Sequence, residues 1–281
     1  MGADAAAGDA ARTARIGSHN RRTLEPANGM AILTVIMPVY NEITTITEAI
    51  RRVLASPLVG QVIVADDGST DGSSKAIAVL AAEDPRIMAV AHTTNEGKGR
   101  ALRSAFPLVA CELAVVQDAD LEYDPNDYPG LVAPIVERRA RVVYGRRDLM
   151  RSTFLSRLAN RALTGLTNLL YGSRLSDMET GLKVMSAQLW RALDLECDSF
   201  DIEPEITGRC LIGGLAILEV DVSYRPRSVA EGKKISWIDA IAAVRVLIAV
   251  RVSGQRRRLD SIDVRPMTSD LDVLDDARAQ R

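Results

Sequence analysis

The chain has 281 residues, of which 47% are hydrophobic, and its formal net charge at pH 7 is −2. This length and hydrophobic content suffice for one large core or two small ones. The near-neutral balance excludes the global basic field that attracts proteins to nucleic acid, so we expect no nucleic-acid partner. Three scattered cysteines without Cys-x-x-Cys spacing predict reduced core thiols in a cytoplasmic protein, not a disulfide or zinc framework.

The two ends of the chain differ in composition from its middle. Residues 1–30 are rich in Ala, Gly and Arg without periodicity, and they predict a disordered leader that lacks an apolar signal-peptide core. Residues 254–281 mix arginines with Asp-rich stretches and predict a flexible tail. No segment supplies about 18 uninterrupted apolar residues, so we expect no transmembrane helix.

Between these ends, apolar strands alternate with amphipathic helices. The pattern predicts strands over 32–39, 61–65, 87–90, 113–116 and 141–145, and helices over 44–54, 73–82, 99–110 and 128–138. Such alternation predicts an α/β fold with a Rossmann-like, mostly parallel central sheet flanked by helices. Sheets of this kind bind ligands at the carboxyl ends of their strands.

Polar residues and glycines follow five of the predicted strands or begin the helices after them. Any one of these segments could be an ordinary turn, which favours Asp, Asn, Ser and Gly. Five of them on one rim of a sheet indicate a binding site instead. The segments are 38–42, 66–72, 95–100, 118–120 and 145–147.

Three carboxylates at alternate positions follow the apolar run that ends at Val116. In an extended segment Asp118, Asp120 and Glu122 would converge on one side. Bunched carboxylates repel one another unless a cation lies among them, and Mg²⁺ and Mn²⁺ prefer oxygen ligands. The triad predicts a metal site that serves a phosphorylated donor, with an acidic, solvated turn as the alternative.

Four motifs in this order resemble family 2 glycosyltransferases with the GT-A fold. They are Val39-Tyr40-Asn41-Glu42, Asp66-Asp67-Gly68-Ser69-Thr70-Asp71-Gly72, Asn95-x-Gly97-Lys98-Gly99-x-Ala101 and Asp118-Ala119-Asp120. The segments 177–184, 203–207 and 231–235 look like the branch of dolichyl- or polyprenyl-phosphate mannosyl- and glucosyltransferases. The resemblance spans Leu33 to Val252 and implies a GT-A catalytic domain over 31–235, followed by an amphipathic helix over 236–253.

The resemblance also implies roles at the donor side. It assigns nucleotide-sugar binding to Pro38, Tyr40, Glu42, Asp66, Asp67, Lys98 and Asp118. It places Asp118, Asp120 and Glu122 around a Mg²⁺ or Mn²⁺ cofactor that bridges the diphosphate. Glu122 stands where the family often has glutamine, which adds negative charge to the site. Cleavage of a nucleotide sugar builds charge on the leaving phosphate, and a divalent cation stabilises that charge.

On the acceptor side the choice is between a base and cations. An acceptor hydroxyl needs a general base, whereas a lipid monophosphate is already anionic and needs cations. The resemblance points to acceptor-phosphate binding by Arg147, Arg151, Ser156, Arg227 and Lys233, and to a catalytic set of Asp120, Arg147 and Asp177. The alternative for the arginines is a solvated helix face. Asp177 could act as a base, position the donor sugar or form a turn.

Two apolar helical stretches, 155–170 and 237–251, carry interspersed arginines. Both are too short or too charged to span a bilayer, but a cationic amphipathic helix can lie in the membrane interface. The alternative is that both pack on the sheet or on a partner subunit. The lipid acceptor implied by the resemblance favours peripheral attachment to the cytoplasmic face of the membrane.

Together these inferences predict an inverting, metal-dependent glycosyltransferase. It would move a hexose from a GDP- or UDP-sugar to polyprenyl phosphate. One alternative is a soluble family 2 enzyme with a hydroxyl acceptor on a glycan or small metabolite, and another is a non-catalytic nucleotide-sugar-binding protein. A nucleotidyltransferase fits less well because 38–42 is not a glycine- and arginine-rich phosphate loop.

Overall fold

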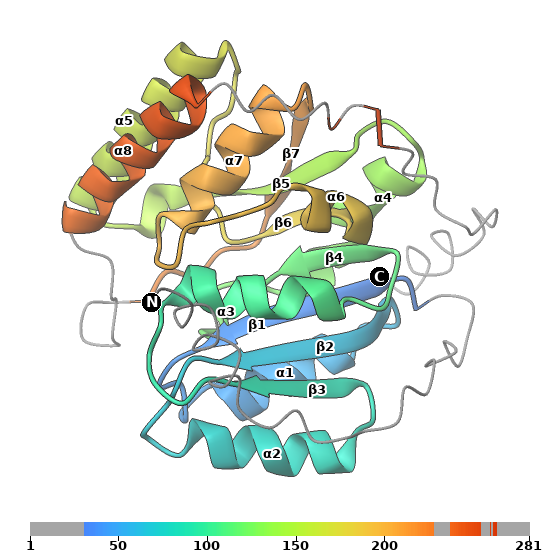
Figure 1. Cartoon of the computed structure of the whole chain (residues 1–281). Coiled ribbons are helices and arrows are strands. Elements are labelled where there is room, and N and C mark those ends of the chain that lie inside the picture. Colours follow the sequence, from blue (N-terminus) through green and yellow to red (C-terminus); the bar gives the residue numbers. More distant parts are fainter. Residues whose placement is uncertain (1–30, 228–236, 254–258, 260, 263–281) are drawn as a thin grey trace, which may run out of the picture.

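The computed structural model describes residues 31–227, 237–253, 259 and 261–262 (Figure 1). The predicted leader and almost all of the predicted tail lie outside these residues. Along the described chain the strands are β1 (Leu33–Val39), β2 (Val59–Asp66), β3 (Ile87–Ala91), β4 (Leu113–Val116), β5 (Val142–Arg147), β6 (Lys183–Ser186) and β7 (Ile217–Val222). The α-helices are α1 (Ile46–Leu54), α2 (Ser73–Glu83), α3 (Lys98–Ala105), α4 (Tyr128–Val136), α5 (Phe154–Tyr171), α6 (Ala187–Ala192), α7 (Ile202–Ile212) and α8 (Trp237–Val252).

The strands form one seven-stranded sheet in the order β3-β2-β1-β4-β6-β5-β7. All of the neighbouring pairs are parallel except the two that involve β6, which runs antiparallel to β4 and β5. The mostly parallel α/β fold predicted from the sequence is therefore confirmed. The reversal of β6 has a consequence for the site, since the residues that lead into β6 reach the edge where the other central strands end. Val116, the last residue of β4, pairs with Lys183, the first residue of β6.

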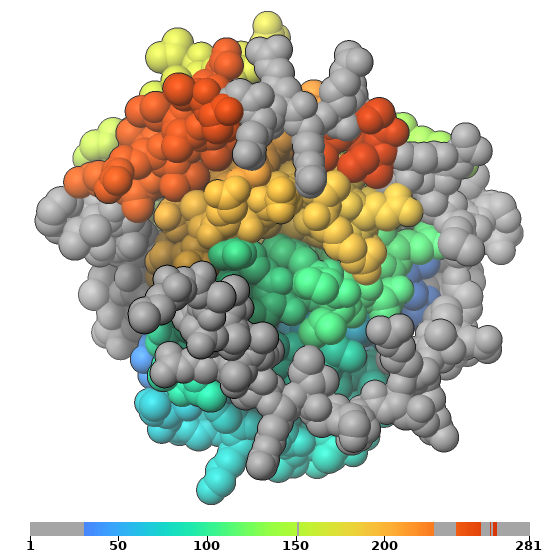
Figure 2. Space-filling model, in the orientation of Figure 1, coloured from blue at the N-terminus to red at the C-terminus, as the bar shows by residue number. Residues whose placement is uncertain are grey.

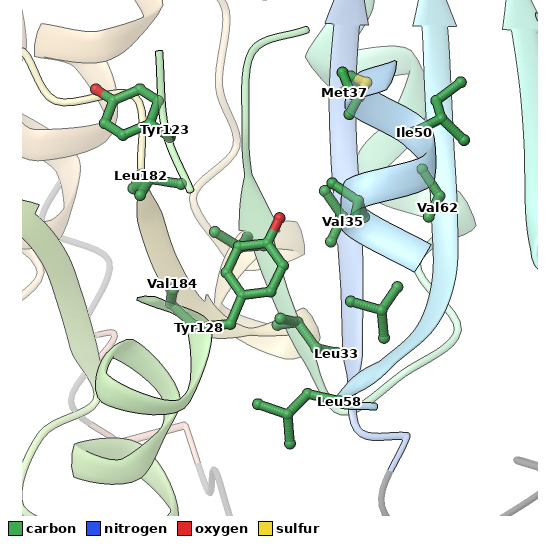
Figure 3. Packing of buried hydrophobic residues seen from close by; sticks show 14 of the residues in the cluster. Leu33, Val35, Met37, Ile50, Leu58, Val62, Tyr123, Tyr128, Leu182 and Val184 are labelled. Carbon is green, nitrogen blue, oxygen red and sulfur yellow. The ribbon is translucent and has the colours of Figure 1, made fainter. Parts of the chain in front are cut away.

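Each face of the sheet is covered by its own set of helices, because successive residues of a strand point to opposite sides. Leu33, Val35 and Met37 of β1 pack in the cluster that holds the buried residues of α1, α2 and α4 (Figure 3). Ile36 belongs to the opposite cluster, with the buried residues of α3, α6 and α7. Figure 2 views this second face, where α3, the α6–α7 region and α8 lie in succession. The buried β-branched and aliphatic runs explain why the central strands lack polar alternation.

Two helices lie at the end of the sheet beyond this core. α5 and α8 pack side by side next to α7 (Figure 1), with Met178 and Leu247 in the small cluster between them. The amphipathic segment predicted over 236–253 is thus helical from Trp237 to Val252. Within the described part of the chain, no helix is both long and apolar enough to cross a membrane.

The third predicted helix differs most from its sequence pattern. The helix expected over 99–110 begins at Lys98 and ends at Ala105, and a short 3₁₀ turn follows over Phe106–Leu108. Pro107 has no N–H and cannot continue the α-helical hydrogen bonds, which accounts for the change of geometry.

Candidate active site

The five polar segments predicted from the sequence meet at one edge of the sheet. β1, β2, β4 and β5 end there, and α3 begins there. The same edge also receives the residues before β6 and the segment after β7, which pairs across the site through the bridge between Tyr123 and Tyr224. The candidate active site is built from these loops.

The segments after β1 and β2 are joined by hydrogen bonds. The Asn41 amide donates to Ser69 Oγ at 2.9 Å, and the Thr70 amide donates to Asn41 Oδ1 at 2.8 Å. Asn41 has φ +56°, a left-handed conformation that asparagine tolerates better than most residues. Pro38 is buried within β1, whereas Tyr40 is partly exposed just beyond it. Of this predicted donor-binding set, Tyr40 and Glu42 therefore reach the rim.

Asp66 and Asp67 are each only 3% exposed, and their carboxylates hold loops in place. Asp66 accepts from the Ser69 amide at 3.1 Å. Asp67 accepts from the Glu96 and Gly97 amides at 2.9 and 2.7 Å, and its Oδ1 is also 2.8 Å from Nδ1 of His92. These bonds tie the loop before α3 to the end of β2. Direct contact of either aspartate with a nucleoside stays a prediction.

Gly97 and Gly99 allow that loop to lie against the chain before α7. Gly97 has φ +103°, and a Cβ there would lie 2.2 Å from the Asp198 carbonyl oxygen. A Cβ on Gly99 would lie 2.3 Å from the Cys197 carbonyl oxygen. Only glycine fits such close backbone contacts. The two glycines therefore fix the start of α3 and with it the position of Lys98.

Lys98 joins the end of β4 to α7. Its Nζ lies 2.8 Å from Asp118 Oδ1 and 3.0 Å from Glu203 Oε1. Burial alone would lower the pKa of Lys98, but Asp118 and Glu203 outweigh burial and raise it. Glu203 also pairs with Lys183, which is fully buried. Burial would raise the pKa of Glu203, but its two lysine neighbours lower it, so the Glu203 carboxylate is held ionised.

The three predicted carboxylates lie on a turn and not on an extended segment. β4 ends at Val116, and the following residues form a turn in which Leu121 has φ +63°. The prediction of an extended 118–122 segment is therefore wrong, because the turn redirects the chain immediately after the strand. Burial, followed by the negative charges of Asp118 and Glu122, raises the pKa of Asp120 to about 7. The charges of Asp118 and Glu122 thus disfavour the ionised form of Asp120.

Arg227, in the segment after β7, lies across this acidic turn. Its amide donates to Glu122 Oε1 at 2.7 Å and its Nε to the Asp120 carbonyl oxygen at 2.8 Å. Its guanidinium also pairs with Glu42 at 2.9 Å. In this arrangement Arg227 bridges the predicted donor-binding and metal-binding loops. Among the described residues, no group of three or more His, Cys, Asp or Glu side chains is arranged to hold a metal ion.

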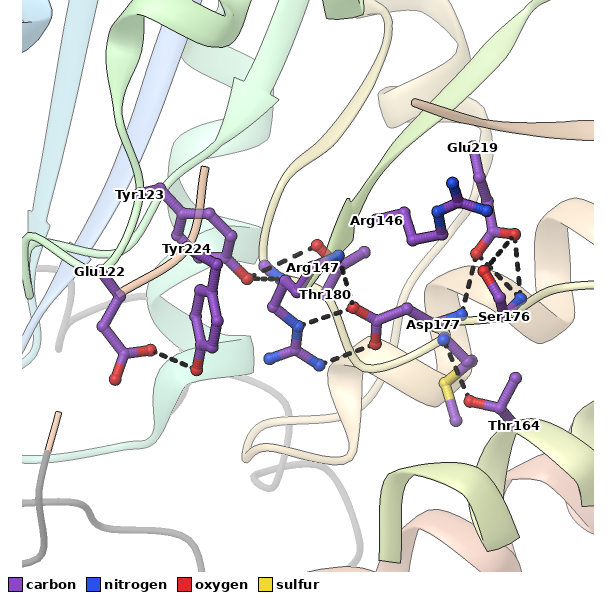
Figure 4. A network of polar contacts seen from close by, with 12 residues as sticks. Glu122, Tyr123, Arg146, Arg147, Thr164, Ser176, Asp177, Thr180, Glu219 and Tyr224 are labelled. Atoms are coloured by element: carbon purple, nitrogen blue, oxygen red, sulfur yellow. Dashed lines mark hydrogen bonds and ion pairs between the residues drawn. The ribbon is translucent and has the colours of Figure 1, made fainter. Parts of the chain in front are cut away.

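Arg147 and Asp177 form a buried pair on the β5–β6 side of the site (Figure 4). The guanidinium donates to both carboxylate oxygens of Asp177, at 2.7 and 2.8 Å, and Asp177 is 1% exposed. The same guanidinium lies 5.2 Å from the centre of the Tyr224 ring, a cation–π contact. Tyr224 in turn donates to Glu122 Oε2 at 2.9 Å. An unbroken set of contacts thus links Asp177 to the acidic turn.

The other predicted acceptor residues are described only in part. Ser156 lies in the first turn of α5, and its Oγ is 2.8 Å from Thr153 Oγ1. The side chain of Arg151 and the whole of Lys233 lie outside the described residues. Their roles at an acceptor phosphate stay predictions.

The structure adds four side chains to the site that the sequence did not assign. Lys183 and Glu203 lie in segments that resemble the family, but no local sequence pattern indicates that the two side chains pair with each other. Tyr224 and His92 carried no recognisable motif. Each is positioned by a contact with a residue of another segment of the chain.

The chain is similar to known glycosyltransferases in sequence. A family model described as glycosyl transferase family 2 matches residues 34–184. An undecaprenyl-phosphate mannosyltransferase of Micrococcus luteus is 30% identical over 244 residues, covering 82% of this chain and 99% of the relative. An undecaprenyl-phosphate 4-deoxy-4-formamido-L-arabinose transferase of Shewanella sediminis is 30% identical, covering 72% of this chain and 61% of the relative.

A solved structure also shares the fold. The glucosyl-3-phosphoglycerate synthase of Mycobacterium tuberculosis, in a complex with Mn²⁺, uridine diphosphate and glucosyl-3-phosphoglycerate, superposes with a TM-score of 0.58. Its sequence is 24% identical, and the match covers 79% of each chain.

Proposed function

The chain belongs to glycosyl transferase family 2, and from this premise we propose that it transfers a hexose from a UDP- or GDP-sugar to polyprenyl phosphate with inversion at the anomeric carbon. The observation that carries the proposal is the arrangement of Lys98, Arg147 and Arg227 around the acidic turn at one rim. A reaction between a nucleoside-diphosphate sugar and a lipid phosphate brings several negative charges together. This rim has both carboxylates that could bind a metal cation and cationic side chains that could bind phosphates.

For the divalent cation, Asp118 and Asp120 fit best. Both follow β4, and burial together with the charges of Asp118 and Glu122 raises the pKa of Asp120, so a cation at this turn would favour the ionised carboxylate. Glu122 was predicted as a third ligand, but its oxygens accept from Tyr224 and Arg227 and would have to exchange partners first. When bound, Mg²⁺ or Mn²⁺ would neutralise the charge that develops on the leaving diphosphate.

For the acceptor we assign Arg147 and Arg227, with Arg151, Ser156 and Lys233 as the further predicted contacts. Planar guanidinium groups match phosphate oxygens well. An oxygen of the acceptor phosphate would attack the anomeric carbon as the bond to the nucleoside diphosphate breaks, and the electron pair would leave with the diphosphate. No proton needs to be removed from the nucleophile, so Asp177 would serve to orient Arg147 rather than as a base.

We propose further that α5 and α8 rest on the membrane that holds the lipid acceptor. Phe154 and Leu155, at the start of α5, are 72% and 73% exposed. Exposed arginines lie on both helices, namely Arg161, Arg245 and Arg251. Apolar side chains beside cationic ones are suited to an anionic lipid surface.

The lipid surface is tested by vesicle co-sedimentation. Leu155→Asp should lower binding to vesicles containing anionic lipid, whereas Val79→Asp, at a 57% exposed position on α2, should not. Equal losses in both variants, or a concentration-dependent dimer that Leu155→Asp abolishes, would argue for another occupant of this face.

Transfer itself is tested by mass spectrometry of lipid products. The protein would be incubated with undecaprenyl phosphate in detergent, a panel of UDP- and GDP-sugars, and Mg²⁺ or Mn²⁺. We expect one nucleotide sugar to give a polyprenyl-phosphate hexose, and Asp120→Ala to give none. Transfer only to a water-soluble alcohol would support the hydroxyl-acceptor alternative, and nucleotide binding without any transfer would support a non-catalytic role.

A further inference from the structure

Buried charged side chains connect the acidic turn to the interior of the protein. Lys98 contacts Asp118 on one side and Glu203 on the other. Glu203 contacts Lys183, and the ammonium of Lys183 also donates to the Thr180 carbonyl oxygen. Two lysines and two carboxylates therefore alternate, and their formal charges cancel without any bound ion.

Most of these groups are fixed in place. Lys183 begins β6 and pairs in the sheet with Val116, two residues before Asp118. Glu203 lies in the first turn of α7 and is 5% exposed. The backbone of Lys98 is held by the glycine contacts on either side of it. Of the two lysines, Lys98 has the side chain that reaches the surface, with 12% of it exposed against 0% for Lys183, and its long stem is flexible.

A divalent cation at Asp118 would change the balance of this set. The cation and the Lys98 ammonium would both approach the same carboxylate and would repel each other at that distance. If the ammonium were expelled to water, the site would lose a cation that faces the donor phosphates. Glu203 offers a second anion 3.0 Å from Lys98 Nζ, so the ammonium can leave Asp118 and remain in the site.

We propose that Lys98 is the resident counter-ion of Asp118, that an entering divalent cation competes with it for this carboxylate, and that Glu203 is the positioning residue that retains the displaced ammonium. This inference rests on the proposed function. It extends that function by giving Glu203 a role and by naming Lys98 as the group that balances the charge of Asp118. Lys98 is then available to the diphosphate once the cation has taken Asp118.

The experiment is a Mn²⁺ titration of nucleotide-free protein, followed by electron paramagnetic resonance. Lys98→Met removes the competitor, and we expect Mn²⁺ to bind about tenfold more tightly than to the unaltered protein. Lys98→Arg keeps a cation and should resemble the unaltered protein. Asp118→Asn in the Lys98→Met background should remove the gain, which identifies the carboxylate responsible.

Glu203→Gln supplies a change of the opposite sign. Without the second anion Lys98 relies on Asp118 alone, so Mn²⁺ binding should weaken about threefold to tenfold. In the double variant Lys98→Met/Glu203→Gln this loss should disappear, because no ammonium remains for Glu203 to retain. Circular dichroism would establish that each variant is folded. If Glu203→Gln does not fold, the Lys98 variants still decide the question.

Weaker or unchanged Mn²⁺ binding by Lys98→Met would overturn the proposal, since an ordinary structural ion pair predicts that result. Equal affinities of Glu203→Gln and the unaltered protein would overturn the role of Glu203. The titration needs no acceptor and no sugar transfer. Failure of the proposed function would therefore appear as absent lipid product, separately from the Mn²⁺ affinities.

Discussion

Replacement of Asp120 by asparagine should stabilise the protein while abolishing transfer. Burial and the charges of Asp118 and Glu122 raise the pKa of Asp120 from 3.8 to about 7. Because a change of one in pKa corresponds to about 1.4 kcal/mol, the ionised carboxylate costs the folded state at most about 4 kcal/mol. Asparagine removes the charge but still buries a polar amide, so we expect a gain of about 2 kcal/mol in the free energy of unfolding.

The sign of the pH dependence follows from the raised pKa. Between pH 3.8 and about 7 the folded protein binds more protons at Asp120 than the unfolded chain does. The contribution of Asp120 to stability therefore falls as pH rises through this window, and the loss is complete above it. The advantage of Asp120→Asn should be largest near pH 8 and small near pH 4.

Thermal unfolding followed by circular dichroism in EDTA measures this difference. A gain of about 2 kcal/mol corresponds to a rise of about 4–8 °C in Tm for a domain of this size. Mn²⁺ with a nucleotide should raise the Tm of the unaltered protein and leave that of Asp120→Asn almost unchanged. The electrostatic reasoning would be refuted if Asp120→Asn were no more stable than the unaltered protein near pH 8. It would also be refuted if the gain in stability were the same near pH 4 as near pH 8.

Two further changes test the scaffold of the site. Gly97→Ala should lower the free energy of unfolding by more than about 2 kcal/mol, because the new Cβ would meet a carbonyl oxygen at a position with positive φ. Gly165→Ala, in α5, should raise the free energy of unfolding slightly, because the space at its Cβ is open. Chemical denaturation of the two variants measures both changes. Arg147→Met should lower the free energy of unfolding by about 3–5 kcal/mol, because it leaves the buried carboxylate of Asp177 without its cationic partner. Adding Asp177→Asn should recover part of that loss in the same assay. Additive losses in the double variant would contradict direct pairing.

The sequence predicted the parts of the fold that local patterns encode. Buried runs identified the strands of the β1–β4 half, and the glycines and acids after them marked the rim. The sequence could not reveal that β6 enters the sheet in reverse, since the four residues Lys183–Ser186 are too few to show a pattern that depends on strand direction. It also could not pair Arg227 with Glu42, which are 185 residues apart. Such contacts depend on the complete topology of the fold and produce no periodic pattern in the sequence.

The position of Arg227 has a consequence for synthesis of the protein. The rim needs both the first strand and the segment after the last strand, because Arg227 closes onto Glu42 and onto the turn at Asp120. A nascent chain whose first four strands have already left the ribosome would therefore carry the donor motifs on an open edge. The contacts of Arg227 can form only when residue 227 has emerged, so the link between the donor motifs and the acidic turn is completed late in translation.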